Sequence, residues 1–396
     1  MANTSLSGQQ DSFRVGSLLT DERSRGIVLQ LLVLLGVALF VAFIVSNTIA
    51  NLQNAGLASG YGFLDDTAFF DINQKLIDYS SQSTFGRALV VGFLNTILVS
   101  ALGIITATLI GFIGGVLRLS DNWIVSRMVT AWVEFTRNVP VLLQIIFWWA
   151  ILTGLPKVRD SIALGDAAFL NNRGLRMPAP ILESGMEWVI AAFVIAVIAA
   201  IAVSRWARKR QEATGQTFPT GWTALGLIIG LPLVVYLILG QPLDWDLPER
   251  TRFNFRGGFN ITPELIALWF ALATYTGAFI SEIVRSGIMA VSRGQSEAAF
   301  ALGLRKNQTM RMIVIPQALR VIIPPLTSQY LNLTKNSSLA IAIGYQDLVS
   351  IGGTILNQSG QALEVVGIWM AVYLSLSLAT SAYMNWYNKR IALVER

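Results

Sequence analysis

The chain has 396 residues, of which 54% are hydrophobic and 13% are charged, with a formal net charge of +6. A soluble protein has about a quarter charged residues, so this composition indicates a protein that crosses a membrane several times. With no cysteine and no histidine, disulfides, thiol nucleophiles, His-based catalysis and the usual zinc sites are excluded, and we expect no metal site.

The N-terminal segment predicts an anchored tail. Residues 1–25 are polar and predict a cytoplasmic tail, whereas residues 26–50 carry no charge and are long enough to cross a bilayer. A signal peptide is the competing interpretation, but its apolar core is usually only about 7–15 residues. We therefore expect an uncleaved extra transmembrane helix, followed by an outer loop over residues 51–87.

Residues 88–153 predict the first part of a transmembrane core. The uncharged run 88–117 contains Gly111, Gly114 and Gly115, and small residues at such spacing permit close helix packing in lipid. Glu134 and Arg137 then stand three residues apart before Pro140, where a helix is expected to start or kink. We interpret Glu134 and Arg137 as a structural ion pair near the interface.

Residues 154–260 predict an insertion with two transmembrane helices, at 188–204 and 222–240, between outer loops at 154–186 and 241–263. The two helices flank the densest basic cluster of the chain, Arg205 to Arg210, which the positive-inside rule places in the cytoplasm. A stop-transfer anchor explains this cluster most simply; a patch for lipid headgroups or nucleic acid is the alternative.

Residues 261–390 predict the second part of the core, with an apolar run that leads into Glu282 and Arg285. These charges, three residues apart, favour an interfacial ion pair or a lining role in a polar path, and both interpretations stand. A basic loop, 295–316, follows between apolar runs and is therefore expected in the cytoplasm. Ser296 and Asn307 are expected to cap two short helices that turn at Gly303.

A broken span follows this loop. Residues 321–344 are apolar but contain Pro324-Pro325, the polar run Lys335 to Ser338, and Gly344. A helix that faces lipid does not carry such residues, whereas a discontinuous segment that lines a protein interior does. The last span is expected to end near residue 388, with Lys389 and Arg390 inside.

Several of these motifs resemble the permeases of ABC importers. The run Glu297-Ala298-Ala299, Gly303, Ile313 and Pro316 resembles the EAA loop of that family, with Ile315 where the family usually has leucine. The runs around Glu134 and Glu282 resemble signatures of polar amino acid permeases. The resemblance covers roughly residues 95–144 and 275–388 and is specific because the signatures occur in the family's order.

The resemblance implies an all-α, polytopic fold of about eight transmembrane helices. A type I importer core of five helices would carry the extra N-terminal helix and the inserted helical pair, as in the long permeases of broad-range L-amino-acid importers. The implied location is the bacterial inner membrane, multi-pass, with both termini cytoplasmic. The competing function classes are an ion-coupled secondary transporter and a membrane scaffold without transport activity.

The implied function is uptake of polar or general L-amino acids. The chain would be a transport subunit and no enzyme, because no lysine follows a glycine and a phosphate-binding loop is therefore missing. No cofactor is expected on the chain; cytoplasmic ATPase subunits would bind ATP. The other implied partners are a second, paralogous permease and a periplasmic amino-acid-binding protein, with no nucleic acid.

The predicted site residues fall into three groups. Those for ATPase coupling are Glu297, Ala298, Ala299, Gly303, Ile313 and Pro316. Those for the substrate path are Lys335, Asn336, Ser337, Ser338 and Glu282, because a zwitterionic amino acid needs donors and acceptors near mid-membrane. In the related permeases a similar Lys-Asn/Asp-Ser/Thr-Ser-Leu run follows the loop; a purely structural role of Asn336 and the serines is the alternative. Those for structural ion pairs are Glu134, Arg137 and Arg285.

Overall fold

The computed structural model describes residues 22–54, 60–251 and 254–391, so most of the expected cytoplasmic tail, 1–25, lies outside the described residues. Seven helical segments within these ranges are long and apolar enough to span a membrane, or eight if one bent helix pair counts as a span. Of the described residues, 73% are helical. This confirms the expected polytopic fold of about eight spans.

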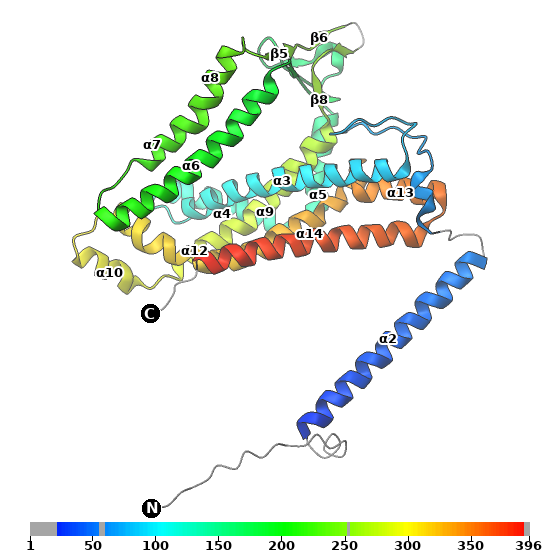
Figure 1. Cartoon of the computed structure of the whole chain (residues 1–396), viewed down its shortest axis with the longest axis horizontal. Coiled ribbons are helices and arrows are strands. Elements are labelled where there is room, and N and C mark those ends of the chain that lie inside the picture. Colours follow the sequence, from blue (N-terminus) through cyan, green and yellow to red (C-terminus); the bar gives the residue numbers. More distant parts are fainter. Residues whose placement is uncertain (1–21, 55–59, 252–253, 392–396) are drawn as a thin grey trace, which may run out of the picture.

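The bundle is built around α3 (Phe85–Leu117) and α9 (Pro263–Met289), which pack against each other more extensively than any other pair of described elements. Around them lie α5 (Val141–Thr153), α12 (Ile315–Asn336), α13 (Leu348–Ser359) and α14 (Ala362–Ile391). Figure 1 shows these helices side by side in one layered bundle. The buried apolar core joins residues from α3, α9 and α12, among them Val99, Leu268 and Leu333.

Three glycines of α3 make this close contact possible. A Cβ atom at Gly111 would lie 2.4 Å from Ile280 of α9, and one at Gly115 would lie 2.6 Å from Val284. The predicted close packing is therefore confirmed. Gly114, with Ser281 Oγ 3.1 Å from its ideal Cβ position, belongs to the same seam.

We predict that Gly115→Ala destabilises the folded protein by about 1–3 kcal/mol, the usual effect of overpacking. The new methyl group would meet the Ser281 carbonyl oxygen at 2.8 Å, and that backbone atom has little room to move. Gly353→Ala on α13 is the matched control, because nothing lies within 4 Å of its Cβ position. Thermal unfolding in detergent should separate the two variants; equal melting temperatures would contradict the packing argument.

The segment α4 (Trp123–Asn138) and α5 is one bent pair. The two helices meet at 106° around Pro140, where α4 has ended and α5 begins at the next residue. Because proline lacks an N–H and clashes with the preceding turn, it fits the start of a helix and not its interior. The expectation of a start or kink at Pro140 is confirmed.

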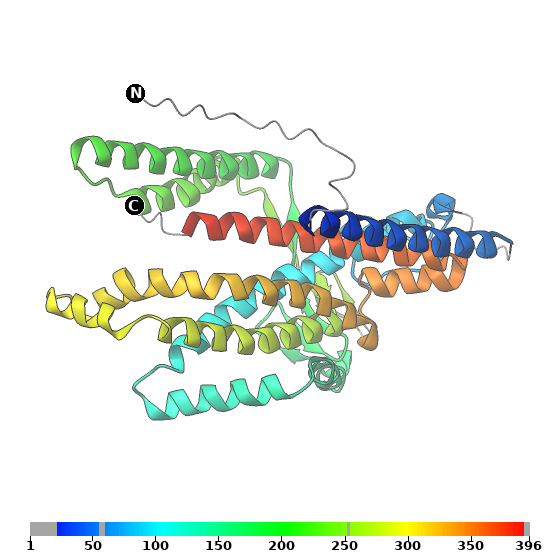
Figure 2. The ribbon, with the colours of Figure 1, turned by 90° about the horizontal axis from the view of Figure 1, so that it is seen from below.

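The inserted helical pair consists of α6 (Met186–Thr214) and a return helix in three pieces, α7 (Thr220–Leu225), η3 (Gly226–Gly230) and α8 (Leu231–Ile238). The η3 piece is π-helical, a wider turn than that of an α-helix, and comes just before Pro232. α6 packs mainly against the three pieces of the return helix. Figure 2 shows the pair to one side of the bundle.

The outer loops on both sides of the inserted pair form short strands that the sequence did not predict. The first loop contributes β1 (Ile162–Ala163), β2 (Phe169–Asn171), β3 (Gly174–Met177) and β4 (Ala179–Leu182). The second contributes β5 (Leu243–Asp246), β6 (Glu249–Arg250), β7 (Phe255–Arg256) and β8 (Phe259–Ile261). Antiparallel pairs β3–β8 and β4–β5 join the two loops, and the described sheets have the orders β1-β2-β3-β8, β4-β5 and β6-β7.

The extra N-terminal helix is α2 (Glu22–Asn54), slightly longer than the expected span 26–50. Its most apolar window has no residue buried inside the protein, and Figure 1 shows it standing apart from the bundle. Side chains such as Leu34 and Phe43 are about two-thirds exposed, at 65% and 66%. Such a surface fits lipid or another transmembrane helix, since an apolar helix in water would be costly.

Candidate functional site

The loop expected to face the ATPase is a helix–turn–helix at one end of the bundle. It consists of α10 (Arg293–Ala301), a turn at Gly303, α11 (Lys306–Thr309) and the π-helical η4 (Met310–Val314), which runs into α12. Gly303 has φ +79°, a left-handed conformation that suits glycine. Figure 2 shows this helix–turn–helix beyond the ends of the neighbouring helices.

Both expected helix caps lie elsewhere. α10 begins after Ser292, about one turn before Ser296, and α11 begins after Arg305, which leaves Asn307 inside the helix. Gln308 accounts for the second difference: its Oε1 atom accepts a hydrogen bond from the Arg305 N–H at 3.0 Å. A glutamine at the third helical position supports the start at Arg305 in the manner of a capping box.

The six predicted coupling residues do not all share one surface. Glu297, Ala298, Gly303 and Pro316 are exposed and Ile313 is half-buried, whereas Ala299 is 3% exposed. Ala299 therefore belongs to the inner side of α10. Its small side chain lets α10 lie close to the elements beneath it.

Large apolar side chains complete the exposed surface of this loop, and the sequence analysis missed them. Leu302 is 83% exposed, Met312 62% and Phe300 50%. Exposed apolar side chains grouped on a protein surface are typical of a contact with another protein or with a membrane. Their signal in the sequence was weak, because single apolar residues next to the Glu-Ala-Ala run look like ordinary helix-packing positions.

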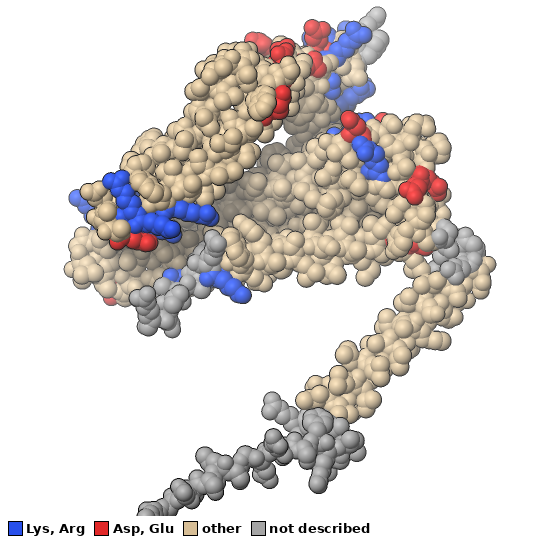
Figure 3. Space-filling model, viewed as in Figure 1, with Lys and Arg blue, Asp and Glu red and all other residues tan. Residues whose placement is uncertain are grey.

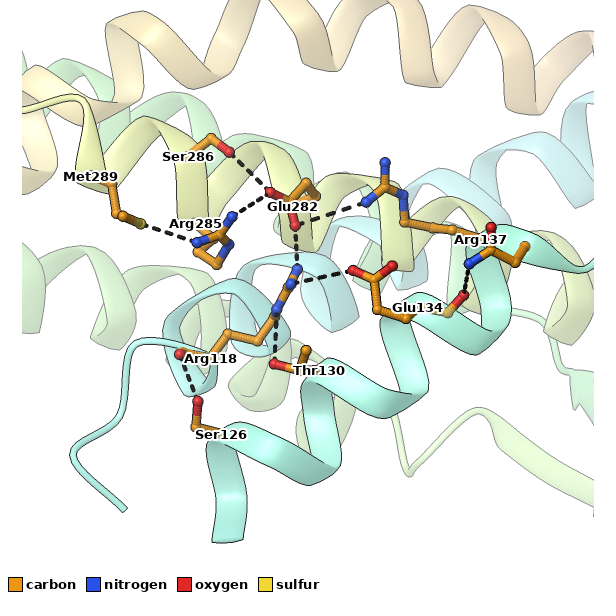
Figure 4. Close-up of polar contacts among 10 residues, drawn as sticks. Arg118, Ser126, Thr130, Glu134, Arg137, Glu282, Arg285, Ser286 and Met289 are labelled. Atoms are coloured by element: carbon orange, nitrogen blue, oxygen red, sulfur yellow. Dashed lines mark hydrogen bonds and ion pairs between the residues drawn. The ribbon is translucent and has the colours of Figure 1, made fainter. Parts of the chain in front are cut away.

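Five charged side chains form a cluster where α3, α4 and α9 meet (Figure 4). Glu282 of α9 is at the centre: one oxygen contacts Arg285 at 2.7 Å, and the other contacts Arg118 and, at 3.9 Å, Arg137. Arg118 also lies 3.8 Å from Glu134. The cluster thus places three guanidinium groups around two carboxylates.

Of the two predicted ion pairs, the structure contains one and not the other. The Glu282–Arg285 pair is present, with a Ser286 hydroxyl donating to the same carboxylate oxygen at 3.2 Å. The expected pair of Glu134 with Arg137 is wrong: Arg137 points across to Glu282 and lies 5.2 Å above the ring of Phe279. The physical reason is that Glu282, which is 23% exposed, is the more buried carboxylate and gains more from an extra cation than Glu134, which is 54% exposed.

Arg118 is the member of this cluster that the sequence did not single out. Its side chain is only 6% exposed, and it bridges carboxylates from two helices. It also reaches the Thr130 hydroxyl at 3.4 Å, while its carbonyl accepts from Ser126 at 2.9 Å. A buried charge is costly unless it is paired, and Arg118 is paired with carboxylates of both α4 and α9. Arg118 therefore joins α3 to these two helices.

The broken span is present, but its break lies after the prolines. α12 continues through the exposed residues Pro324 and Pro325, so the expected interruption there is wrong. Transmembrane helices tolerate proline where neighbours or local adjustments satisfy the freed carbonyl groups. The helix ends at Asn336, continues as the tighter 3₁₀ segment η5 (Ser337–Ile343) and stops at Gly344, which has φ +78°.

The four polar residues at this break differ in what they contact. The Ser337 hydroxyl is buried and donates to the Thr334 carbonyl at 2.8 Å, and the Ser338 hydroxyl donates to the Lys335 carbonyl at 2.8 Å. The side chains of Lys335 and Asn336 make no hydrogen bond or ion pair with any residue of the described ranges, and Lys335 is exposed. These two side chains therefore have no polar partner among the described residues, whereas both serine hydroxyls donate to backbone carbonyl groups about one turn earlier.

The chain after the break is anchored to α3 by buried polar groups that the sequence analysis did not assign. Asn95 donates to the carbonyl groups of Gln346 and Gln74, at 2.9 and 2.7 Å. The Tyr345 hydroxyl donates to the Asn95 carbonyl at 3.2 Å. Asp347, wholly buried, caps α13 by accepting from Ser350 N–H at 2.9 Å. The non-helical backbone is therefore held by specific partners, as membrane interiors require.

These features together are those of a polytopic membrane protein with an exposed helix–turn–helix and a discontinuous interior segment. A family described as "Binding-protein-dependent transport system inner membrane component" matches residues 213–393. The chain is 55% identical over 394 residues to the general L-amino acid transport system permease protein AapQ of Rhizobium johnstonii, covering 99% of this chain and 98% of that one.

Two further relatives cover nearly the full length. The putative amino-acid ABC transporter permease protein YhdX of Escherichia coli K12 is 51% identical, covering 94% of this chain and 95% of the relative. The glutamate/glutamine/aspartate/asparagine transport system permease protein BztB of Rhodobacter capsulatus is 43% identical, covering 97% of each chain. The chain belongs to the family of ABC-importer permeases.

Proposed function

We propose that the chain is the transmembrane permease subunit of an ABC importer for polar or general L-amino acids. The proposed coupling to an ATPase rests on the exposed apolar surface of α10 and of the turn after it, where Leu302 is 83% exposed. The substrate class rests on the likeness to relatives whose names specify amino acids. A bacterial inner-membrane location, with both termini in the cytoplasm, belongs to the same proposal.

The proposed partners are those that the family of ABC-importer permeases implies. A cytoplasmic ATPase would receive Leu302 and Phe300 in a groove and thereby move α11 and α12, since η4 joins these two helices without a loop. A second, paralogous permease would line the other side of the substrate path. A periplasmic amino-acid-binding protein would deliver the substrate to the outer face, where the strands and α13 lie (Figure 1).

Within the membrane we assign the substrate contact to Asn336 and Lys335. A zwitterionic amino acid loses water on crossing, so it needs both donors and acceptors in the path. The carboxamide of Asn336 supplies both, and the Lys335 ammonium pairs with a carboxylate. Glu282, proposed earlier for the path, is better assigned to the charged cluster, because both of its oxygens contact arginines.

An ion-coupled secondary transporter is the competing class, and it makes a different prediction about energy. Such a transporter would run on an ion gradient alone, whereas the proposed importer requires ATP hydrolysis by a separate subunit. The experiment is reconstitution of the permease pair with ATPase and binding protein in vesicles, followed by uptake of an amino acid panel. Uptake that depends on ATP inside the vesicle supports the proposal; uptake driven by an ion gradient without ATPase contradicts it.

We predict that Asn336→Leu reduces uptake at least about tenfold, or changes selectivity within the panel, if one hydrogen bond of about 1.5 kcal/mol to a charged group is lost. Insertion, assembly and basal ATP hydrolysis should remain, because Asn336 contacts no described side chain through a hydrogen bond. The matched control is Asn332→Leu, one turn earlier on α12 and exposed. If Asn336→Leu takes up every amino acid of the panel at the wild-type rate, Asn336 does not bind the substrate and its role is structural.

A further inference from the structure

The inserted helical pair encloses a cavity at its basic end. A cavity of about 590 Å³ lies between α6 and the return helix. One part of its wall is apolar, with Val197, Ala200, Ile201 and Ile228. The other part is polar, with the side chains of Ser204, Arg205, Arg208, Gln211 and Thr220. A single cavity thus changes from apolar to cationic along the length of α6.

The two arginines of this cavity carry unbalanced charge. Neither Arg205 nor Arg208 forms an ion pair or hydrogen bond with another described residue, and no carboxylate lines the cavity. Their neighbour Arg210 is held elsewhere, 5.4 Å above the Trp206 ring and 3.0 Å from the Gln216 side chain. Figure 3 shows the basic side chains gathered at this end of the molecule, beside the broad uncharged surface of the helices.

We infer that this cavity is a binding site for an anionic phospholipid of the inner leaflet. The phosphate group would pair with Arg205 and Arg208, while an acyl chain would lie along Val197, Ala200 and Ile228. Basic pockets between membrane helices at the cytoplasmic surface suit such headgroups. Guanidinium groups bind phosphate oxygens through paired hydrogen bonds.

A lipid fits the cavity better than the other anions that share its phosphate chemistry. A free phosphate would use the arginines but leave the apolar wall empty. An acidic face of a cytoplasmic protein would reach the exposed arginines but not Ala200, which is 5% exposed. The inference depends on the membrane orientation of the inserted pair and not on the transport of amino acids, so its test and the uptake experiment fail independently.

The test is native mass spectrometry of the purified permease complex from membranes that contain phosphatidylglycerol and phosphatidylethanolamine. The wild-type complex should retain phosphatidylglycerol. The double variant Arg205→Gln/Arg208→Gln should retain about thirtyfold less, if each arginine contributes the usual attraction to an anionic lipid surface. The control Lys209→Gln/Arg210→Gln removes the same charge from the same helix outside the cavity and should retain the lipid.

A second variant tests the apolar wall without changing charge. Val197→Trp fills the cavity and should also lose the lipid, whereas Ile198→Trp, at a position 61% exposed outside the cavity, should not. Equal retention by the two double variants, or by the two tryptophan variants, overturns the inference. Displacement of the lipid by inorganic phosphate would assign the site to a soluble anion instead. Loss of the ATPase subunit from Arg205→Gln/Arg208→Gln, with lipid retention unchanged, would assign the arginines to a protein contact.

Discussion

Gly303→Val will reduce ATP-dependent uptake at least about tenfold, while Gly303→Asn will keep most of it. Gly303 has φ +79°, and nothing lies within 4 Å of its Cβ position, so any effect comes from the backbone conformation. An L-residue in the left-handed region costs roughly 1–2 kcal/mol, and a β-branched one is a genuine outlier there, whereas asparagine visits the region readily. A valine should therefore reorient α11 relative to α10.

Uptake and ATPase co-purification, measured on the same vesicles, separate the possible causes. Gly303→Val should insert normally, because the turn lies outside the transmembrane bundle, but it should bind the ATPase poorly. Equal uptake by the valine and asparagine variants would show that the left-handed turn has no part in coupling.

Arg118→Gln will destabilise the folded permease by about 3 kcal/mol, the lower end of the range for breaking a buried ion pair. The lower end applies because Glu282 keeps contacts with Arg137 and Arg285, at 3.9 and 2.7 Å, after Arg118 is lost. Glu134 is 54% exposed and partly hydrated, so the loss of Arg118 destabilises it less. The destabilisation should be greatest where α3, α4 and α9 meet. Uptake should fall as well.

The matched control for Arg118 is Arg127→Gln on α4. Arg127 is exposed and forms no ion pair with a residue in the described part of the chain, so its replacement should change the melting temperature little. Adding Glu282→Gln to Arg118→Gln should lower the stability further, because Arg137 and Arg285 then lose the carboxylate that they share. Identical melting temperatures for Arg118→Gln and Arg127→Gln would contradict the bridging role.

The sequence was informative wherever a physical signal is local. Uncharged runs located the helices, because a bilayer demands long apolar segments. The small residues Gly111 and Gly115 indicated a close helix contact, although not that α9 is the partner. The spacing from Glu297 to Pro316 located the helix–turn–helix with Gly303 at its turn. The polar run from Lys335 to Ser338 likewise located the break after α12.

What the sequence missed depends on long-range contacts. Glu134 stands one turn from Arg137, yet Arg118 and Glu282, distant in the chain, decide its pairing. The strands are two to four residues long, too short for an alternating pattern to emerge. The burial of Ala299 beside the exposed Leu302 also follows from how α10 lies on the bundle, which neighbouring residues alone do not specify.

Cross-linking of single cysteines tests most directly whether the ATPase docks at the turn between α10 and α11. The chain has no cysteine, so Leu302→Cys and the control Leu164→Cys, in the outer loop and 52% exposed, give unique attachment points. A short bifunctional thiol reagent should join Leu302→Cys, and not Leu164→Cys, to the ATPase subunit in the assembled complex. Absence of that product together with labelling of Leu302→Cys by an impermeant reagent from the periplasm would contradict a cytoplasmic coupling loop.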